Sequence, residues 1–285
     1  MNIAFLGLGR MGAILAGHVA ASEHTLTVWN RDAAKAEPFL DLGATVALSS
    51  AAAVADAEVV FTCFFGPDSV REVVLDAELP WSTGAVWVDI TTVGPHFAAE
   101  CADWAAARGI RYVHAPVLGS LGPARNRDLG VLLGAADAEA RSLARSIVSL
   151  WADPERIIEY DTAAKAGVGK LVVNYGLAVG VQALVEALTI AEAGGLTLDE
   201  GLALTGLAKT PLATIAGMKG ATIKNHAWEP TQFSTNLLAK DVDLMFAVAG
   251  GLALPALTAA FASLERARRA GHGEHDFSAL AGEKL

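Results

Sequence analysis

A lysine and an asparagine stand four residues apart at the start of a long apolar segment. In the stretch AGVGKLVVNYG, Lys170 and Asn174 precede a run that stays almost wholly apolar to about residue 191. Residues four apart on an α-helix lie about 40° apart around its axis, so both side chains project from one face. Burying a charge is costly unless a partner needs it. Lys170 is therefore predicted either to lie exposed at the helix start or to face a cleft as a proton donor. Gly167 and Gly169 are interpreted as leaving room for a ligand against the backbone.

A glycine-rich turn forms a second candidate site. Residues 7–12, GLGRMG, have the G-x-G-x-x-G spacing, with a strand-like run before them and a helical pattern after them. The first glycine makes the tight turn, the second lets backbone N–H groups approach a pyrophosphate, and the third lets helix and strand pack closely. The alternative is a glycine-rich turn without a ligand. The predicted cofactor-binding residues here are Gly7, Leu8, Gly9, Arg10, Met11 and Gly12.

The end of the second strand-like run, LTVW at 26–29, predicts which nucleotide binds. An NAD enzyme usually carries Asp or Glu there for the ribose 2′-OH, whereas this chain has Asn30 and Arg31, with Lys35 one helical turn on. A cation suits a 2′-phosphate and an acid would repel it, so NADPH is predicted to be preferred over NADH. The alternative is that Asn30 caps a helix while Arg31 and Lys35 are solvated.

The elements that must position these residues alternate between strand and helix in the first half of the chain. Such alternation predicts parallel strands joined by right-handed helical crossovers, which is a doubly wound α/β sheet. Strands are predicted near 2–6, 26–29, 58–63, 85–90, 111–115, 130–134 and 156–160, and helices near 10–21, 31–42, 95–108 and 137–150.

The strand pattern ends after Asp161 and Thr162, and the rest of the chain reads as helical. We predict a Rossmann-type NADP-binding domain over 1–161, followed by an all-helical substrate and oligomerisation domain over 162–285. The second domain opens with a helix from about 162 to 193, and Gly194 and Gly195 are predicted to end it. A helical domain of this kind often buries an apolar face against a second copy, so a homodimer or homotetramer is expected.

Composition limits the classes of partner. The chain is 53% hydrophobic and 18% charged with a net charge of -10, which indicates a compact globular protein rather than one that binds nucleic acid or an anionic membrane. The apolar run 171–191 is interrupted by polar residues and is predicted to be a buried helix. The two cysteines show no metal-ligand spacing, so no metal is expected and a cytoplasmic setting is predicted. The N-terminus does not have the pattern of a signal peptide.

Taken in order, six stretches make the chain resemble the β-hydroxyacid dehydrogenase family. That family includes 3-hydroxyisobutyrate dehydrogenase, tartronate semialdehyde reductase and the glyoxylate/succinic semialdehyde reductases. The resemblance covers essentially all 285 residues. The matching stretches are GLGRMG at 7–12, WNR at 29–31, DITTVGP at 89–95, HAPVLGS at 114–120, GVGKLVVN at 167–174 and AKDVDLM at 239–245.

The resemblance implies hydride transfer between nicotinamide C4 and the carbonyl carbon of a small hydroxyacid or semialdehyde. Lys170 takes the position of the family's catalytic lysine, which would protonate the alkoxide during reduction and accept the hydroxyl proton during oxidation. Asn174 would then hydrogen-bond the substrate.

Other roles follow from the same resemblance. Thr92 would lie near the nicotinamide and its ribose, and Lys240 would reach the cofactor from the helical domain with Asp241 beside it. Phe64 and Phe65 would pass along the cofactor. The alternatives are that Thr92 serves as a helix cap and that Lys240 and Asp241 form an ordinary solvated pair.

One departure from the family bears on the substrate. Many relatives have Ser-Gly-Gly after APV, where this chain has Leu118, Gly119 and Ser120. Gly119 still allows a backbone amide to approach a carboxylate, and Ser120 could replace the lost hydroxyl. Leu118 makes a bulkier or less polar carbonyl compound conceivable.

Several alternatives remain open. GSLG at 119–122 breaks the serine-nucleophile pattern because Leu118 replaces its first glycine. His272 and His275 suggest no third metal ligand and are interpreted as solvated, while His114 is predicted to pack, with assistance to the substrate as the alternative. An NADPH-binding interaction module without turnover and an imine reductase are the competing functions, and the related imine reductases generally lack this lysine.

Overall fold

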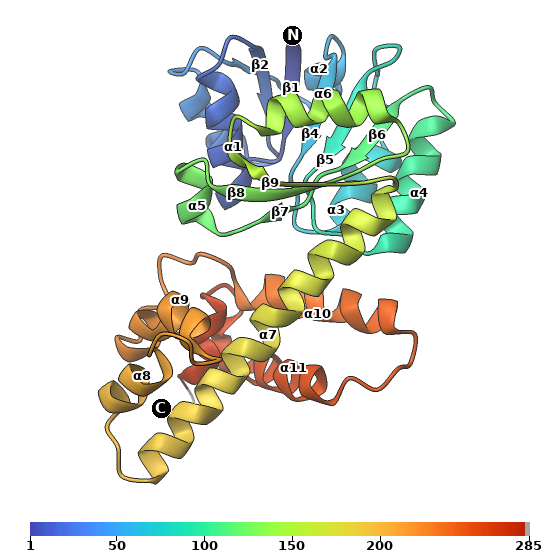
Figure 1. Cartoon of the computed structure of the whole chain (residues 1–285). Coiled ribbons are helices and arrows are strands. Elements are labelled where there is room, and N and C mark those ends of the chain that lie inside the picture. The colour runs from blue at the N-terminus through green and yellow to red at the C-terminus, as the bar shows by residue number, and fades with distance from the viewer. Residues whose placement is uncertain (283–285) are drawn as a thin grey trace. The chain divides into compact units, whose positions relative to one another are not determined.

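The structure, a computed structural model, describes residues 1–282 and forms two compact units (Figure 1). They are Met1–Lys170 and Leu171–Leu285, called unit 1 and unit 2 below. The sequence predicts the division at the start of the longest helix, α7 (Ala163–Ala193), whereas the two units divide within that helix. Lys170 therefore closes unit 1, and Asn174 belongs to unit 2.

A single sheet forms the centre of unit 1. Its strand order is β3-β2-β1-β4-β5-β6-β8-β7, and β9 pairs with β8. The pairings among β1 to β6 are all parallel, which confirms the predicted doubly wound arrangement. The strands are β1 (Asn2–Leu6), β2 (Thr25–Trp29), β3 (Thr45–Val46), β4 (Val59–Thr62), β5 (Val86–Asp89), β6 (Arg111–His114), β7 (Val117–Leu118), β8 (Leu129–Gly134) and β9 (Ala152–Tyr160).

The sheet changes direction beyond β6. Strand β8 runs antiparallel to both β6 and β7, and β9 is parallel to β8. Strands β6 and β7 therefore run in the same direction, with only Ala115 and Pro116 between them, and both pair with β8. The chain reverses after Leu118, so the segment that follows β7 lies at the same end of the sheet as the carboxyl ends of the parallel strands.

Helices connect the strands of unit 1. They are α1 (Arg10–Ala20), α2 (Ser50–Val54), α3 (Pro67–Val70), η3 (Arg71–Leu75), α4 (Pro95–Ala106), α5 (Leu121–Arg125) and α6 (Ala138–Val148). The predicted helix over 31–42 is wrong, because that segment forms two short 3-10 turns, η1 (Ala33–Lys35) and η2 (Glu37–Phe39). Pro38 lacks an N–H group and its ring clashes with the preceding turn, so one continuous helix cannot pass through it.

Strand register brings polar residues together at one end of the sheet. Across β4, β5, β6 and β8 the aligned residues are Thr62, Asp89, His114 and Gly134. The first three are completely buried, although each ends a strand that is otherwise mostly apolar. In open parallel sheets ligands bind beyond the carboxyl ends of the strands, so this row lies directly beneath the place where a ligand is expected.

Unit 2 is helical, as predicted. Apart from one isolated bridge between Ser234 and Asp276, the regular elements described between 171 and 282 are helices. They are the remainder of α7, α8 (Leu198–Thr205), α9 (Ala213–Lys224), α10 (Thr235–Ala249), α11 (Pro255–Ala267), η4 (Arg268–His272) and η5 (Phe277–Ala281).

Helix α7 contributes much of the core of unit 2. Its Val181, Leu184, Val185 and Leu188 side chains are completely buried together with residues of α10 and α11. Among residues 1–282, α7 is the one helix whose length and apolar composition would allow it to cross a membrane. In the most apolar stretch of α7, 44% of the residues are buried in the structure.

Candidate active site

Two of the glycines in the turn before α1 are required by packing. Gly7 has a φ of 98°, and a Cβ there would collide with the carbonyl oxygen of Cys63 and with the ring of Phe64. A Cβ on Gly12 would collide with the carbonyl oxygen of Gly7. Larger residues are therefore excluded at both positions, as the dinucleotide-binding motif requires.

Gly9 differs because the protein itself leaves room beside it. A Cβ on Gly9 would meet no protein atom within 4 Å. Gly9 also occupies the N-cap of α1, where it provides no side-chain cap for the first turn of that helix. The N–H groups at a helix N-terminus attract an anion, and here the space beside Gly9 at that terminus is open. This arrangement fits the pyrophosphate of a dinucleotide.

Asn30 holds the glycine-rich turn in place. Its Oδ1 accepts a hydrogen bond from the backbone N–H of Leu8 at 2.8 Å, and its Nδ2 donates to the carbonyl oxygen of Asp32 at 2.9 Å. The side chain that caps η1 belongs to Asp32, which accepts from the N–H of Ala34. The alternative that Asn30 caps a helix is therefore wrong, because its side chain is committed to the turn.

The predicted cations for a 2′-phosphate both have acidic neighbours. Arg31 Nη2 lies 2.5 Å from Glu72 Oε2, in a pair whose side chains are 66% and 63% exposed. Lys35 Nζ lies 4.0 Å from Asp32 Oδ2, also at the surface. Exposed ion pairs of this kind stabilise a protein by about 0.2–1 kcal/mol, so a phosphate could displace either acid.

Two loops beyond the strand ends are tied to each other. The hydroxyl of Thr91 accepts from the N–H of Phe64 at 3.0 Å, and the N–H of Thr91 donates to Asp89 Oδ1 at 3.0 Å. The loop after β4 carries Phe64 and Phe65, and the loop after β5 carries Thr92. Phe65 is exposed, and Thr92 is half-buried. The sequence predicted Thr92 and missed Thr91, which fixes one loop against the other.

The segment Leu118–Ser120 follows directly on this edge. Gly119 has a φ of 130°, and a Cβ there would lie 2.7 Å from the Leu129 side chain, so only glycine fits. Leu118 pairs with Gly130 in β8 and is half-buried. Ser120 precedes α5, and its side chain caps no N–H group of that helix.

Lys170 is buried at this segment. Lys170 is only 8% exposed, and its Nζ donates a hydrogen bond to the carbonyl oxygen of Val117 at 2.8 Å. The possibility that it is a surface lysine is therefore wrong. Val117 immediately precedes Leu118, so the amine lies at the start of the segment predicted to bind substrate.

The glycines beside Lys170 serve packing. A Cβ on Gly167 would lie 3.3 Å from the carbonyl oxygen of Val93, and one on Gly169 would lie 3.0 Å from Leu132 and 3.1 Å from the hydroxyl of Tyr160. The interpretation that these glycines leave room for a ligand is wrong, since protein atoms of unit 1 occupy that space. The glycines allow α7 to lie close against the sheet.

Asn174 forms a polar group with two residues of α10 in unit 2. Asn174 is 1% exposed, and its Nδ2 donates to Asp241 Oδ2 at 2.5 Å. Asp241 Oδ1 lies 2.9 Å from Lys240 Nζ, and the Asp241 side chain is 1% exposed. The alternative of an ordinary solvated pair is therefore wrong for Lys240 and Asp241. Asp241 fixes the orientation of the Asn174 amide.

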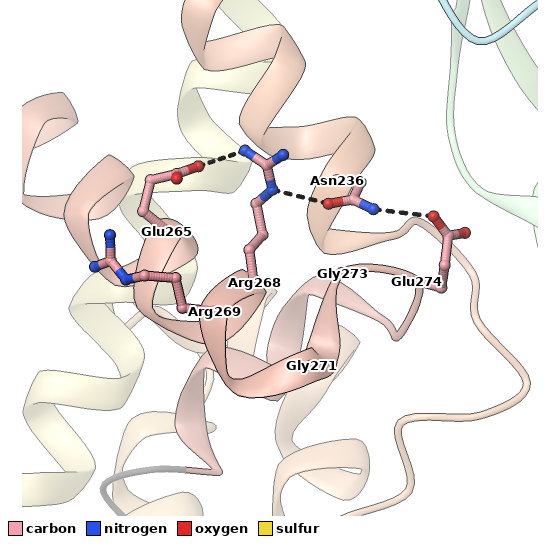
Figure 2. Close-up of a pocket in the computed structure, with 7 residues that line it drawn as sticks. All are labelled: Asn236, Glu265, Arg268, Arg269, Gly271, Gly273 and Glu274. Carbon is pink, nitrogen blue, oxygen red and sulfur yellow. Dashed lines mark hydrogen bonds and ion pairs between the residues drawn. The ribbon is translucent and has the colours of Figure 1, made fainter.

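Unit 2 also contains a pocket that none of the predicted site residues lines (Figure 2). Its polar side chains bind one another: Glu265 pairs with Arg268, Arg268 Nε donates to Asn236 Oδ1 at 2.8 Å, and Asn236 Nδ2 donates to Glu274 Oε1 at 2.9 Å. The remaining lining residues are Arg269, Gly271 and Gly273.

The two histidines near that pocket contact each other. Nδ1 of His272 and Nδ1 of His275 lie 2.9 Å apart, and both residues are partly buried, so the interpretation of them as freely solvated is wrong. Within residues 1–282, no group of three or more His, Cys, Asp or Glu side chains is arranged to hold a metal ion.

Comparison with known proteins identifies the family to which the chain belongs. Residues 2–160 match the family model described as the NAD binding domain of 6-phosphogluconate dehydrogenase, and residues 164–283 match the one described as NAD-binding of NADP-dependent 3-hydroxyisobutyrate dehydrogenase. A probable mitochondrial 3-hydroxyisobutyrate dehydrogenase-like 1 from Arabidopsis thaliana is 30% identical over 98% of this chain and 83% of its own length. Glyoxylate/succinic semialdehyde reductase 1 from the same plant is 27% identical over 98% of this chain and 97% of its own length.

Solved structures agree with these matches. The Mycobacterium tuberculosis 3-hydroxyisobutyrate dehydrogenase, solved with L-serine, superposes with a TM-score of 0.85 and 27% identity over 99% of this chain and 98% of that one. Other relatives, named cytokine-like nuclear factor N-PAC, match over 98% of this chain, which spans about half of their length. The glycine-rich turn, the buried lysine and these matches together show that the chain belongs to the family of NAD(P)-dependent hydroxyacid dehydrogenases that includes 3-hydroxyisobutyrate dehydrogenase.

Proposed function

We propose that this protein is an NADP-dependent oxidoreductase that transfers a hydride between the nicotinamide and a small β-hydroxyacid or semialdehyde, with Lys170 as the general acid and base. The observation that carries the proposal is the buried Lys170 amine, held 2.8 Å from the carbonyl oxygen of Val117. An amine is costly to bury, and this one lies at the start of the segment that the family uses for substrate.

A bound nicotinamide supplies the hydride acceptor for oxidation and the hydride donor for reduction. Lys170 gives a proton to the substrate oxygen during reduction and takes the hydroxyl proton during oxidation. Its positive charge also stabilises the negative charge that develops on that oxygen. The bond to Val117 fixes the direction of the side chain before a substrate arrives, which lowers the entropic cost of reaching the reactive geometry.

Asn174 hydrogen-bonds the substrate in this proposal. Because its Nδ2 donates to Asp241, the amide has a defined orientation, and its polar group is positioned before binding. Lys240 shares the same carboxylate, so the negative charge of Asp241 is compensated within unit 2. Lys240 is proposed to contact the cofactor.

The preference for NADP rests on the end of β2. Asn30 stands where an NAD enzyme would carry an acid, and Arg31 and Lys35 supply cations for a 2′-phosphate. The family model that matches residues 164–283 carries the description NADP-dependent. The acidic neighbours of both cations weaken the preference without removing it, since each pair is exposed.

A substrate panel tests the proposed reaction. The purified protein is mixed with NADPH and, one at a time, glyoxylate, succinic semialdehyde, tartronate semialdehyde and carbonyl compounds without a carboxylate, and with NADP and 3-hydroxyisobutyrate in the other direction. We expect turnover of at least one compound, followed at the NADPH absorbance. Because Leu118 replaces a polar residue of the family, the less polar carbonyl compounds belong in the panel.

The outcomes of the panel separate the competing functions. Tight NADPH binding with no turnover of any compound would contradict the proposal and favour a non-catalytic NADPH-binding module. Turnover that requires an added amine together with the carbonyl compound would favour an imine reductase.

A further inference from the structure

His114 makes two hydrogen bonds that one neutral imidazole cannot make. The residue ends β6 and is completely buried. Its Nδ1 lies 3.2 Å from the carbonyl oxygen of Ala163, and its Nε2 lies 3.0 Å from the carbonyl oxygen of Thr91. A carbonyl oxygen only accepts, so each ring nitrogen must donate, whereas a neutral imidazole carries a single N–H group. Both bonds form together only when the ring is protonated on both nitrogens.

A buried carboxylate stands beside this ring to balance its charge. Asp89 is the register neighbour of His114 in the adjacent strand and is also completely buried. Thr62 Oγ1 donates to Asp89 Oδ1 at 2.7 Å and accepts from Trp87 Nε1 at 2.9 Å. The hydroxyl of Tyr112 donates to Asp89 Oδ2 at 3.3 Å. A carboxylate that only receives donors is satisfied in its ionised form.

The charges around the pair favour this arrangement. Burial raises the pKa of Asp89, and the positive charge of His114 with hydrogen bonds from Thr91 and Thr62 opposes that rise without cancelling it. Burial and the charge of Asp89 also raise the pKa of the Tyr112 hydroxyl and of the Cys101 thiol, which keeps both neutral. Asp89 is therefore the anion that His114 faces in this cluster.

The two carbonyl oxygens belong to segments that carry candidate site residues. Thr91 precedes Thr92 in the loop after β5, and Ala163 is the first residue of α7, seven positions before Lys170. Gly134, the register neighbour of His114 on its other side, leaves no space: a Cβ there would lie 2.5 Å from the carbonyl oxygen of Thr162. The start of α7 therefore lies directly on the strand ends, held by the ring of His114.

We propose that His114 is a buried imidazolium, its charge balanced by the neighbouring Asp89 carboxylate, that acts as a positioning residue by holding the loop of Thr92 and the first turn of α7 in one fixed geometry. The first two turns of α7 are then fixed at both ends. His114 binds the carbonyl oxygen of Ala163 at the first residue, and the Lys170 amine binds the carbonyl oxygen of Val117. The proposed charge state of His114 does not depend on which reaction the protein catalyses. The proposed effect of His114 on turnover rests on the proposed function of Lys170.

The charge state is measured by nitrogen NMR on the full chain labelled with ¹⁵N-histidine. The chain has seven histidines, and the His114→Gln variant assigns the signal that disappears. In spectra recorded from about pH 6 to about pH 8.5, we expect both ring nitrogens of His114 to carry a proton, because each one donates to a carbonyl oxygen. A neutral tautomer of His114 at about pH 8 would overturn the proposal.

Asp89→Asn tests the pairing. Without the carboxylate, the His114 signal should change to that of a neutral ring within the same pH range, and an unchanged, protonated ring would refute the role of Asp89. If this variant fails to fold, the spectrum of the unmodified protein still decides the charge state of His114.

Turnover tests the positioning role. His114→Gln keeps one donor nitrogen, replaces the other with an acceptor oxygen and loses the charge, so we expect kcat to fall about tenfold or more while the NADPH dissociation constant stays within about twofold. A variant whose kcat equals that of the wild-type protein would refute the positioning role. If Lys170→Ala proves harmless, the proposed function fails, but the NMR result for His114 stands by itself.

Discussion

Glu72→Gln is the change that tests how the protein recognises the nucleotide. Glu72 Oε2 lies 2.5 Å from Arg31 Nη2, and both side chains are about two-thirds exposed, at 63% and 66%. If Arg31 binds the 2′-phosphate, the phosphate and Glu72 compete for one guanidinium group. Removing the carboxylate charge should therefore strengthen NADPH binding and leave NADH binding unchanged, because NADH has no 2′-phosphate.

The size of the effect follows from the exposure of the pair. Exposed ion pairs contribute about 0.2–1 kcal/mol, and about 1.4 kcal/mol corresponds to a tenfold change in affinity. The NADPH dissociation constant should accordingly fall by about 1.4-fold to fivefold. Salt screens exposed charges, so the gain should shrink as ionic strength rises.

The assay is a fluorescence titration of each nucleotide, with Glu100→Gln as the matched control. Glu100 pairs with Arg71 at 2.7 Å on the same surface and is 48% exposed, so its substitution removes an equal charge from another exposed pair. Weaker NADPH binding by Glu72→Gln, an equal gain for NADH, or an equal gain in the control would refute the assignment of Arg31.

Three further predictions concern the turn, the exposed helix and a buried ion pair. Gly9→Ala should leave the melting temperature unchanged and weaken NADPH binding at least about tenfold, whereas Gly12→Ala should lower the melting temperature, because only Gly12 has protein atoms where a Cβ would lie. Val172, 67% exposed on α7, is proposed to be covered by a second copy, so Val172→Asp should shift sedimentation toward a smaller species; a monomeric unmodified protein at micromolar concentration would contradict this. Lys219→Met should destabilise the protein by about 3–5 kcal/mol in thermal or urea unfolding, because it leaves the buried Asp276 carboxylate without its cation. Burial raises the pKa of Asp276, but Lys219 and hydrogen bonds from Ser278 lower it further, to below its ordinary value. The contribution of the pair is therefore present above about pH 4 and is lost as pH falls through the lowered pKa, and unfolding curves that do not change between about pH 5 and pH 2 would contradict it.

Most of the parallel sheet could be predicted because its strands are short apolar runs bounded by turn residues. β1, β4 and β5 are buried over nearly their whole length, and such runs have few alternatives in a chain that alternates with helices. The two-residue strand β7 is too short to show any periodicity, so the antiparallel edge could not be predicted. The segment 31–42 has a helical composition, which is why one helix was predicted there. Pro38 was the signal against a continuous helix.

The candidate site was predicted where a motif is local and missed where it depends on register. The glycine-rich turn and Lys170 lie in contiguous stretches with a recognisable pattern. The bonds that join Asp89 to Thr62, and His114 to Ala163, span 27 and 49 residues, and they require the strand order and register. A signal was present: each of Thr62, Asp89 and His114 is a polar residue at the carboxyl end of a largely apolar strand.

The central claim is that Lys170 transfers the proton, and single-turnover and steady-state rates of Lys170→Ala test it most directly. Lys165→Ala is the matched control, since Lys165 lies on the same helix, is 59% exposed and pairs with Asp161 at the surface. The account predicts that Lys170→Ala lowers kcat by about 10²–10⁴ with NADPH affinity nearly intact, because the amine acts mainly in the transition state, while Lys165→Ala keeps normal rates. A folded Lys170→Ala protein that turns over substrate at the wild-type rate would contradict the account.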